Sequence, residues 1–161
     1  MSHKILLPID LDQEALLDSV FAVATEHART HDSLFILLSV VPQVSLGYFP
    51  SIEARYMRKV VAEAKRRLGR IGDQRLGTEF GWSAHVLVGR PGRAIVEVAD
   101  EHAVDLIVMA SHSPRRLDVL LGSVADWVVR HAHHSVLIVR QPSLPALASV
   151  GPGDADHSAA G

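Results

Sequence analysis

Five short hydrophobic runs recur along the chain. They lie at residues 5–9, 34–41, 82–88, 106–110 and 136–139. Four of these runs are continuous, which is typical of strands buried on both faces in a parallel sheet. The run at 82–88 alternates instead, so Trp82, Ala84, Val86 and Val88 are expected to point inward from a strand nearer the sheet edge.

Between the runs, apolar residues recur every three or four positions, as they do along amphipathic helices. We expect helices at about residues 15–28, 51–76, 91–99 and 122–131. Asp10 or Asp12 is the candidate cap of the first helix.

The second expected helix is long and strongly charged. It carries one apolar stripe: Ile52, Tyr56, Val60, Ala64 and Leu68. Gly69 or Gly72 is a candidate break in it. The charged residues between 55 and 70 are interpreted as its solvated face.

Strands and helices alternate, which predicts an α/β domain. We expect a five-stranded, mostly parallel sheet in the order 3-2-1-4-5 with helices on both faces, a Rossmann-like arrangement. The domain is expected to span residues 1–141. Residues 142–161 are rich in Pro, Ala, Gly and Ser without periodicity, so we expect a flexible C-terminal tail.

The expected strand order also predicts where a ligand would bind. In open parallel sheets ligands lie beyond the carboxyl ends of the strands, where the strand order reverses, here between the first and fourth strands. Gly122 and Ser123 begin a helix near this point, and free amides at a helix start can bind an anion. The same pair also suits an ordinary helix cap, so both alternatives stay open.

Composition narrows the function classes. The 161 residues include no cysteine, which excludes disulfides and thiol chemistry and fits a cytoplasmic protein. A net charge of −2 and 5% aromatic residues argue against binding to nucleic acid or to an acidic membrane surface. The apolar runs are too short for a membrane span or a signal peptide. The chain has no P-loop motif.

Two groups contain the residue types of a metal site or of a hydrolase catalytic triad, but not the spacing or motif that such a site needs. The three histidines within 131–134 lie at a helix end, without a Cys or a separate carboxylate as co-ligand. Ser123, His112 and Asp10 lack the G-x-S-x-G turn of a hydrolase nucleophile. We therefore expect no metal held by side chains and no catalytic residue.

The chain resembles the universal stress protein family over about residues 3–140. Lys4–Asp10 is similar to the first strand of that family, and Ala103–Ala110 is similar to its fourth. The most specific similarity covers Leu121–Ala125 and the segment from Val129 to Arg140.

The loop after the fourth run departs from the ATP-binding motif of that family, G-x2-G-x9-G-[ST]. Ala110 and Ser113 stand at the first two glycine positions, and eight residues separate Ser113 from Gly122. The loop instead resembles the branch with Ser-His-x-Pro and Leu-Leu-Gly-Ser, at 111–114 and 120–123 here. Members of that branch can bind ATP, so the resemblance still implies nucleotide binding.

Residue by residue, the resemblance implies contacts on the base and sugar of the nucleotide. Val41 would flank the adenine with Pro8 and Ile9, and Met109–Ala110 would line the sugar and base. Asp10 would meet the ribose or a metal-bound water; its alternative role is the helix cap.

The resemblance also implies contacts on the phosphates. The residues concerned are Ser111, His112, Ser113, Arg116, Gly122, Ser123 and Val124. The alternatives are an exposed loop position for His112 and a solvated side chain for Arg116, which with Arg115 is the nearest cation to the crevice. Mg²⁺ would accompany ATP, held mainly by phosphate oxygens and water.

The function implied by the resemblance is an ATP-binding regulator of stress or energy state with little or no hydrolysis. It would form a homodimer through its last strand and act on an unknown protein partner. The alternatives are a nucleotide-independent interaction adaptor and a slow ATPase.

Overall fold

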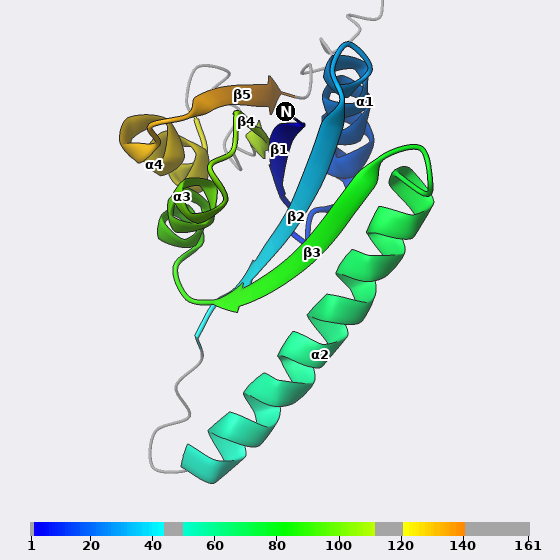
Figure 1. Cartoon of the computed structure of the whole chain (residues 1–161). Helices are drawn as coiled ribbons and strands as arrows, with labels where there is room; N and C mark the ends of the chain where they lie inside the picture. The colour runs from blue at the N-terminus through cyan, green and yellow to red at the C-terminus, as the bar shows by residue number, and fades with distance from the viewer. Residues whose placement is uncertain (1, 44–49, 112–120, 141–161) are drawn as a thin grey trace, which may run out of the picture.

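The computed structural model describes residues 2–43, 50–111 and 121–140. Five strands form one sheet in the order β3-β2-β1-β4-β5 (Figure 1). The strands are β1 (His3–Pro8), β2 (Ser33–Val41), β3 (Gly81–Val88), β4 (Leu106–Ser111) and β5 (Ser135–Arg140). All neighbouring strands pair in parallel, so the predicted order is confirmed and the sheet is entirely parallel rather than mostly so.

A helix connects each strand to the next. The helices are α1 (Leu17–Ala28), α2 (Pro50–Arg75), α3 (Pro91–His102) and α4 (Ser123–His131), and a short 3-10 turn, Glu14–Leu16, precedes α1. None of the helices in the described part of the chain has the length and apolar character needed to cross a membrane. The expected tail, 142–161, lies outside the described residues.

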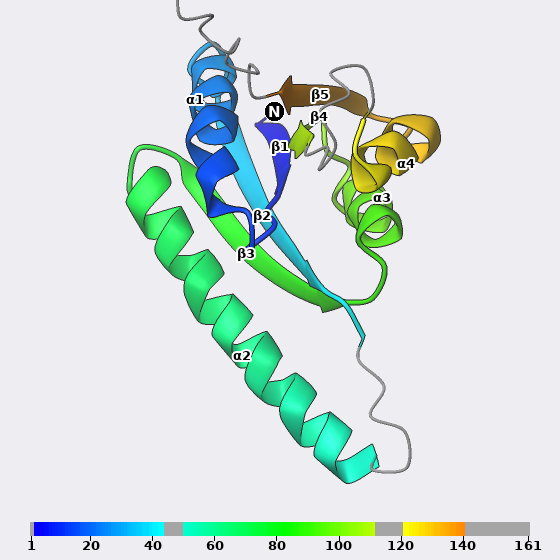
Figure 2. The same ribbon diagram turned by 180° about the vertical axis from the view of Figure 1, so that it is seen from behind.

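The alternation of side chains along the strands builds one core on each face of the sheet. On one face, Ile5 and Leu7 of β1 pack with buried residues of α1 and α2. On the other face, Leu6 of β1 packs with buried residues of α3 and α4. Figures 1 and 2 show the helix pairs on opposite sides of the sheet, as predicted.

The edge strand β3 is less buried than its pattern predicts. Trp82 and Val86 pack against the core that includes α2. Ala84, however, is exposed, and Val88 is 44% exposed. Because side chains alternate along a strand, these two residues share the predicted face of Trp82 and Val86, but the packed core covers that face only in part.

Helix α2 runs unbroken through both of its glycines, so the expected break is absent from it. Gly72 is buried because Trp82 of β3 packs directly on it: a methyl group at Gly72 would lie 2.6 Å from the indole ring. Nothing lies within 4 Å of a methyl group placed at Gly69. One glycine therefore permits helix–sheet packing, and the other has no packing role.

We expect alanine at these two positions to change stability in opposite directions. Gly72→Ala forces the Trp82 ring to move and should lower the free energy of unfolding by about 1–3 kcal/mol. Gly69→Ala removes a flexible residue from a helix interior and should raise it by about 0.5–1 kcal/mol. Urea unfolding of both variants measures the difference, and shifts in the same direction would contradict the packing of Trp82 on Gly72.

Candidate functional site

The carboxyl ends of β1, β2 and β4 converge on a cavity of about 730 Å³. Its walls also include the starts of α3 and α4, the segment that leads from β1 to α1, and the middle of α2. This is the place where the strand order reverses, since β1 lies between β2 and β4 while the chain crosses from one side of β1 to the other. The cavity therefore lies where the sequence predicts a ligand.

Most of the predicted contact residues within the described chain line this one cavity. They are Pro8, Ile9, Asp10, Val41, Met109, Ala110, Gly122, Ser123 and Val124. Ser111 lies next to the lining, at the end of β4. His112, Ser113 and Arg116 lie outside the described residues. The structure thus brings together residues that are more than 100 positions apart, and their role in binding stays a prediction.

Ser111 joins the end of β4 to the start of α4. Its hydroxyl oxygen accepts a hydrogen bond from the Gly122 amide at 3.1 Å. Gly122 is the N-cap of α4, with an extended backbone (φ −61°, ψ 154°), and its carbonyl accepts the first helical bond, from Asp126. The amides of Ser123 and Val124 follow in the first turn, where an α-helix offers no internal acceptor. These two amides are available to an anion, while that of Gly122 is already used by Ser111.

Asp10 shapes the turn after β1 rather than capping a helix. Its Oδ1 accepts a hydrogen bond from the Asp12 amide at 3.0 Å, and its carbonyl accepts one from Gln13 at 3.1 Å. Helix α1 and the 3-10 turn before it begin without a side-chain cap. The predicted cap at Asp10 or Asp12 was wrong, because Asp10 forms a local Asx turn before the helical segment starts. Both carboxylates belong to the cavity wall.

Helix α2 forms a wall of the cavity that was not expected from the sequence. Lys59, Val60, Glu63, Ala64 and Arg67 all line the cavity. The charged stretch of α2 is therefore not entirely a solvated face. The spacing could have indicated this wall, since positions 59, 63 and 67 are four residues apart and adjoin the apolar stripe through 60 and 64.

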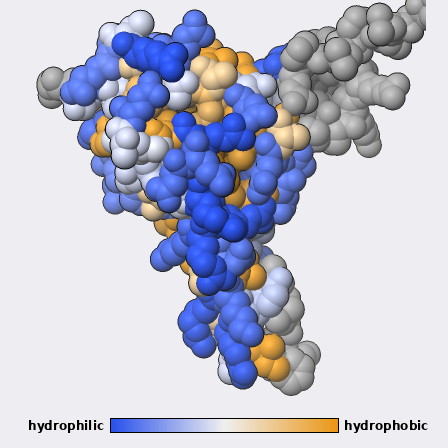
Figure 3. Space-filling model, turned by 90° about the vertical axis from the view of Figure 1, so that its right-hand side faces the viewer, coloured by the Kyte–Doolittle hydropathy of each residue, from blue (hydrophilic) through white to orange (hydrophobic). Residues whose placement is uncertain are grey.

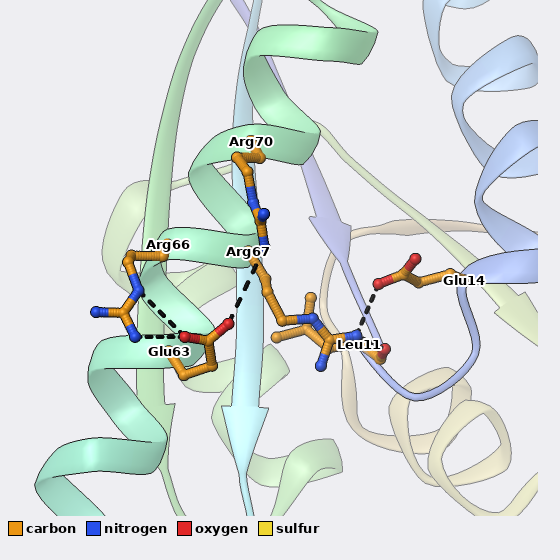
Figure 4. A network of polar contacts seen from close by, with 6 residues as sticks. All are labelled: Leu11, Glu14, Glu63, Arg66, Arg67 and Arg70. Atoms are coloured by element: carbon orange, nitrogen blue, oxygen red, sulfur yellow. Dashed lines mark hydrogen bonds and ion pairs between the residues drawn. The ribbon is translucent and has the colours of Figure 1, made fainter.

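Arg67 fastens α2 to the segment between β1 and α1. Its guanidinium donates to the carbonyl oxygen of Leu11 and to Oε1 of Glu14, the latter at 2.7 Å (Figure 4). The hydrogen bond with Glu14 raises the pKa of Arg67 above its ordinary value. These hydrogen bonds hold α2 against the segment that follows β1, so that two parts of the cavity wall are joined.

Glu63, the acidic residue in this wall, is held by neighbouring arginines. Nε of Arg66 donates to Oε2 of Glu63 at 3.1 Å, and Arg70 approaches Oε1 at 4.0 Å. The hydrogen bond from Arg66 holds the pKa of Glu63 below its ordinary value. Among the described residues of the lining, Glu63, Asp10 and Asp12 are three carboxylates against the two cations Lys59 and Arg67.

Two of the C-terminal histidines have other partners. The His131 ring stacks on the Trp127 indole with 3.9 Å between centroids, and its Nδ1 lies 2.7 Å from the Trp127 carbonyl oxygen. Nε2 of His134 lies 2.9 Å from Oδ1 of Asp100. Within the residues that the structure describes, no set of three His, Cys, Asp or Glu side chains is arranged to hold a metal ion.

Comparison with known proteins gives a consistent family. Residues 1–140 match the model of the universal stress protein family. Universal stress protein MJ0531 of Methanocaldococcus jannaschii is 40% identical over 145 residues, which cover 86% of this chain and 82% of that protein. Universal stress protein MJ0577 of the same organism is 28% identical over 162 residues, with 88% and 96% covered.

Solved structures share the fold. The structure of MJ0577 aligns with a TM-score of 0.76 and covers 89% of this chain and 99% of that one. A universal stress protein in complex with cAMP aligns at 0.55, with 24% identity over 86% of this chain and 97% of that one. The protein from Archaeoglobus fulgidus in complex with dAMP aligns at 0.54, with 22% identity over 84% and 96%.

Proposed function

The chain belongs to the universal stress protein family, and from this premise we propose that it binds an adenine nucleotide, ATP, in the cavity beyond β1 and β4. The observation that carries the proposal is the convergence of the β1 end, the β4 end and the α4 start on one cavity. The cAMP and dAMP complexes of proteins with the same fold support an adenine nucleotide as ligand.

The wall of the cavity divides into an apolar and a polar part. Pro8, Ile9, Val41 and Met109 offer apolar surface for the adenine and ribose. The first turn of α4 offers amides and the positive end of the helix dipole for the phosphates. The base then lies toward β1 and β2, and the phosphates lie toward α4.

The carboxylates of the wall favour a nucleotide that arrives with a cation. Asp10 and Asp12 offer carboxylate oxygens, which can bind Mg²⁺ or accept hydrogen bonds from its bound water. Mg²⁺, held mainly by the phosphates, would reduce the repulsion between the triphosphate and these two residues. Asp10 orients either the ribose or a metal-bound water.

The cavity supplies little of what phosphoryl transfer needs. Of the two cations in the described lining, Arg67 already serves Leu11 and Glu14, and Lys59 lies on α2, which packs on the face of the sheet opposite α4. Because phosphoryl transfer depends on charge stabilisation, we expect little or no hydrolysis. The nucleotide then acts as a regulatory ligand of a cytoplasmic dimer that contacts a further protein.

The dimer of this proposal forms through β5. Among the described strands β5 pairs with β4 alone, and Leu137 on it is 37% exposed. An open apolar edge strand favours pairing with a second copy. Nucleotide occupancy at the α4 start, in the crossover between β4 and β5, would influence that contact.

Calorimetry with Mg-ATP on the purified protein tests the proposal. We expect saturable heat at submillimolar nucleotide, and mass spectrometry of protein purified without added nucleotide should detect a bound adenine nucleotide. Phosphate release should stay near the background rate. Absence of heat from folded protein, together with absence of co-purified nucleotide, would reject nucleotide binding.

The interaction adaptor is the second candidate function. The observation that favours it is the hydrogen bond from the Gly122 amide to Ser111, which already occupies one donor of the expected phosphate cradle. An adaptor would keep its partner binding when the cavity is blocked, whereas a nucleotide-dependent regulator would not.

A further inference from the structure

Strand β2 carries two buried serines among apolar residues, and they differ in their hydrogen bonds. Ser33 is 9% exposed and Ser39 is 4% exposed. The Ser33 hydroxyl donates to the carbonyl oxygen of Ala28, and the carbonyl oxygen of His31 is also 3.3 Å away. The Ser39 hydroxyl has no hydrogen-bond partner within the part of the chain that the structure describes.

The side chain of Ser39 points to the face of the sheet that α1 and α2 cover. Side chains two positions apart in a strand share a face, and Leu37 belongs to the core on that face. On one side Ser39 is in register with Val86 of β3. On the other side lies Ile9, whose amide donates to the carbonyl oxygen of Leu38 at 2.7 Å. Ile9 and Val86 pack in the same core as Leu37, so the hydroxyl lies among apolar side chains.

Ser39 also lines the cavity beyond β1 and β4. Among the described side chains, only His3 has a polar atom that is both enclosed and unpaired. Because the Ser39 oxygen is unpaired, it is not enclosed and opens into the cavity. Figure 3 shows that the outer surface on the side of α2 is mostly hydrophilic, whereas Val60 and Ala64 of this helix line the cavity. Of the strand residues in the described lining, Ser39 alone has a polar side chain.

The fold by itself does not explain this hydroxyl. A buried polar group without a partner destabilises a protein relative to an apolar group of similar size, because it loses hydrogen bonds to water. Alanine at position 39 would keep the strand and remove the unpaired group. A bound molecule explains the serine, since it would supply the missing hydrogen bond. A hydroxyl both donates and accepts, so it suits either kind of polar group on that molecule.

We propose that Ser39 is a specificity-determining residue of the cavity, whose hydroxyl accepts a hydrogen bond from the 6-amino group of adenine. The proposal rests on the nucleotide proposed above, whose base lies toward β1 and β2. Asp10, expected at the ribose, is exposed, whereas Ser39 is buried. The edge of the base farthest from the ribose therefore reaches Ser39, and this edge carries the 6-amino group. Helix α4, with the phosphates, covers the opposite face of the sheet.

Isothermal titration calorimetry with two nucleotides tests the contact. Ser39→Ala should weaken the binding of Mg-ATP about three- to tenfold, which is the usual effect of one hydrogen bond. It should not weaken the binding of purine riboside triphosphate, which lacks the 6-amino group. Ser33→Ala is the matched control, because it removes the other buried hydroxyl of β2, outside the described cavity lining, and should leave both affinities unchanged.

The outcomes separate this proposal from nucleotide binding itself. If the wild-type protein binds Mg-ATP and Ser39→Ala binds it equally well, the role of Ser39 is rejected and the proposed function stands. An equal loss of affinity for both nucleotides would also reject the contact with the 6-amino group. If the wild-type protein binds no Mg-ATP, the proposed function fails, and the role of Ser39 fails with it.

Thermal unfolding without nucleotide separates a role in binding from a role in the fold. Ser39→Ala removes an unpaired hydroxyl and should leave the midpoint unchanged or raise it by a few degrees. Ser33→Ala removes a hydroxyl that is hydrogen-bonded and should lower the midpoint. A fall in Ser39→Ala as large as that in Ser33→Ala would mean that the fold itself uses the Ser39 hydroxyl, which would overturn the proposal.

Discussion

Aspartate at position 122 should lower the affinity for Mg-ATP at least 100-fold while leaving the protein folded. Gly122 begins α4, at the place where the proposal puts the phosphates. Two unit charges 4 Å apart repel by about 1 kcal/mol in water and about 4 kcal/mol near a protein surface. A carboxylate facing a triphosphate therefore removes two or more orders of magnitude of affinity.

The fold should tolerate this change because of the backbone conformation at Gly122. Its φ of −61° and ψ of 154° are accessible to any residue, and aspartate is a preferred helix N-cap. The thermal midpoint should stay constant or rise slightly. Gly122→Asn is the matched control, since asparagine has nearly the same size and capping ability without the charge.

Isothermal titration calorimetry of both variants separates the effect of the added charge on Mg-ATP affinity from the effect of the added side-chain volume. We expect Gly122→Asn to bind Mg-ATP at least tenfold more tightly than Gly122→Asp. Unchanged affinity in Gly122→Asp would mean that the phosphates do not lie at α4. If Gly122→Asp also still binds the partner protein, the result favours the interaction adaptor over the nucleotide-dependent regulator.

Leu68→Ala should lower the free energy of unfolding by about 2–5 kcal/mol, the usual cost of emptying a buried leucine site. Leu68 is fully buried in the core that joins α2 to β1 and β2. Ile52→Ala, on the same ridge of the same helix, should change the value by about 0.5 kcal/mol or less, because its side chain is half exposed.

Urea unfolding at low protein concentration is the suitable measurement, since it keeps association from adding to the stability of either variant. A large loss in Ile52→Ala under these conditions would mean that the start of α2 packs on its own chain. A small loss in Leu68→Ala would contradict the anchoring of α2 on the sheet.

The order of elements could be predicted from local patterns in the chain. Continuous apolar runs such as Leu34–Val41 and helical spacings such as Ala94–Ala99 indicate which faces of an element are buried. The reason is that the removal of apolar side chains from water is favourable wherever they stand in the chain. The parallel sheet follows from their alternation. The ends of β1 and β4 follow in turn as the place for a ligand.

The edge strand marks the limit of such patterns. Ala84 lies between the polar residues Ser83 and His85, and Val88 continues the same alternating face, yet both are exposed. An alternating pattern shows which residues share a face and does not show how far the covering helix extends over that face. The role of Asp10 also could not be predicted from the pattern, since a local Asx turn competes with helix capping for the same carboxylate.

The sequence by itself determined the elements, their parallel order and the place where the β1, β4 and α4 ends meet. Only the tertiary structure decided that α2 closes the cavity with Lys59 and Arg67, and that Ser111 occupies the Gly122 amide. The physical reason is that burial and helical spacing are properties of residues close in sequence. A contact between α2 and the β1–α1 segment depends instead on the direction in which a long helix crosses the sheet, which is set by packing such as that of Trp82 on Gly72.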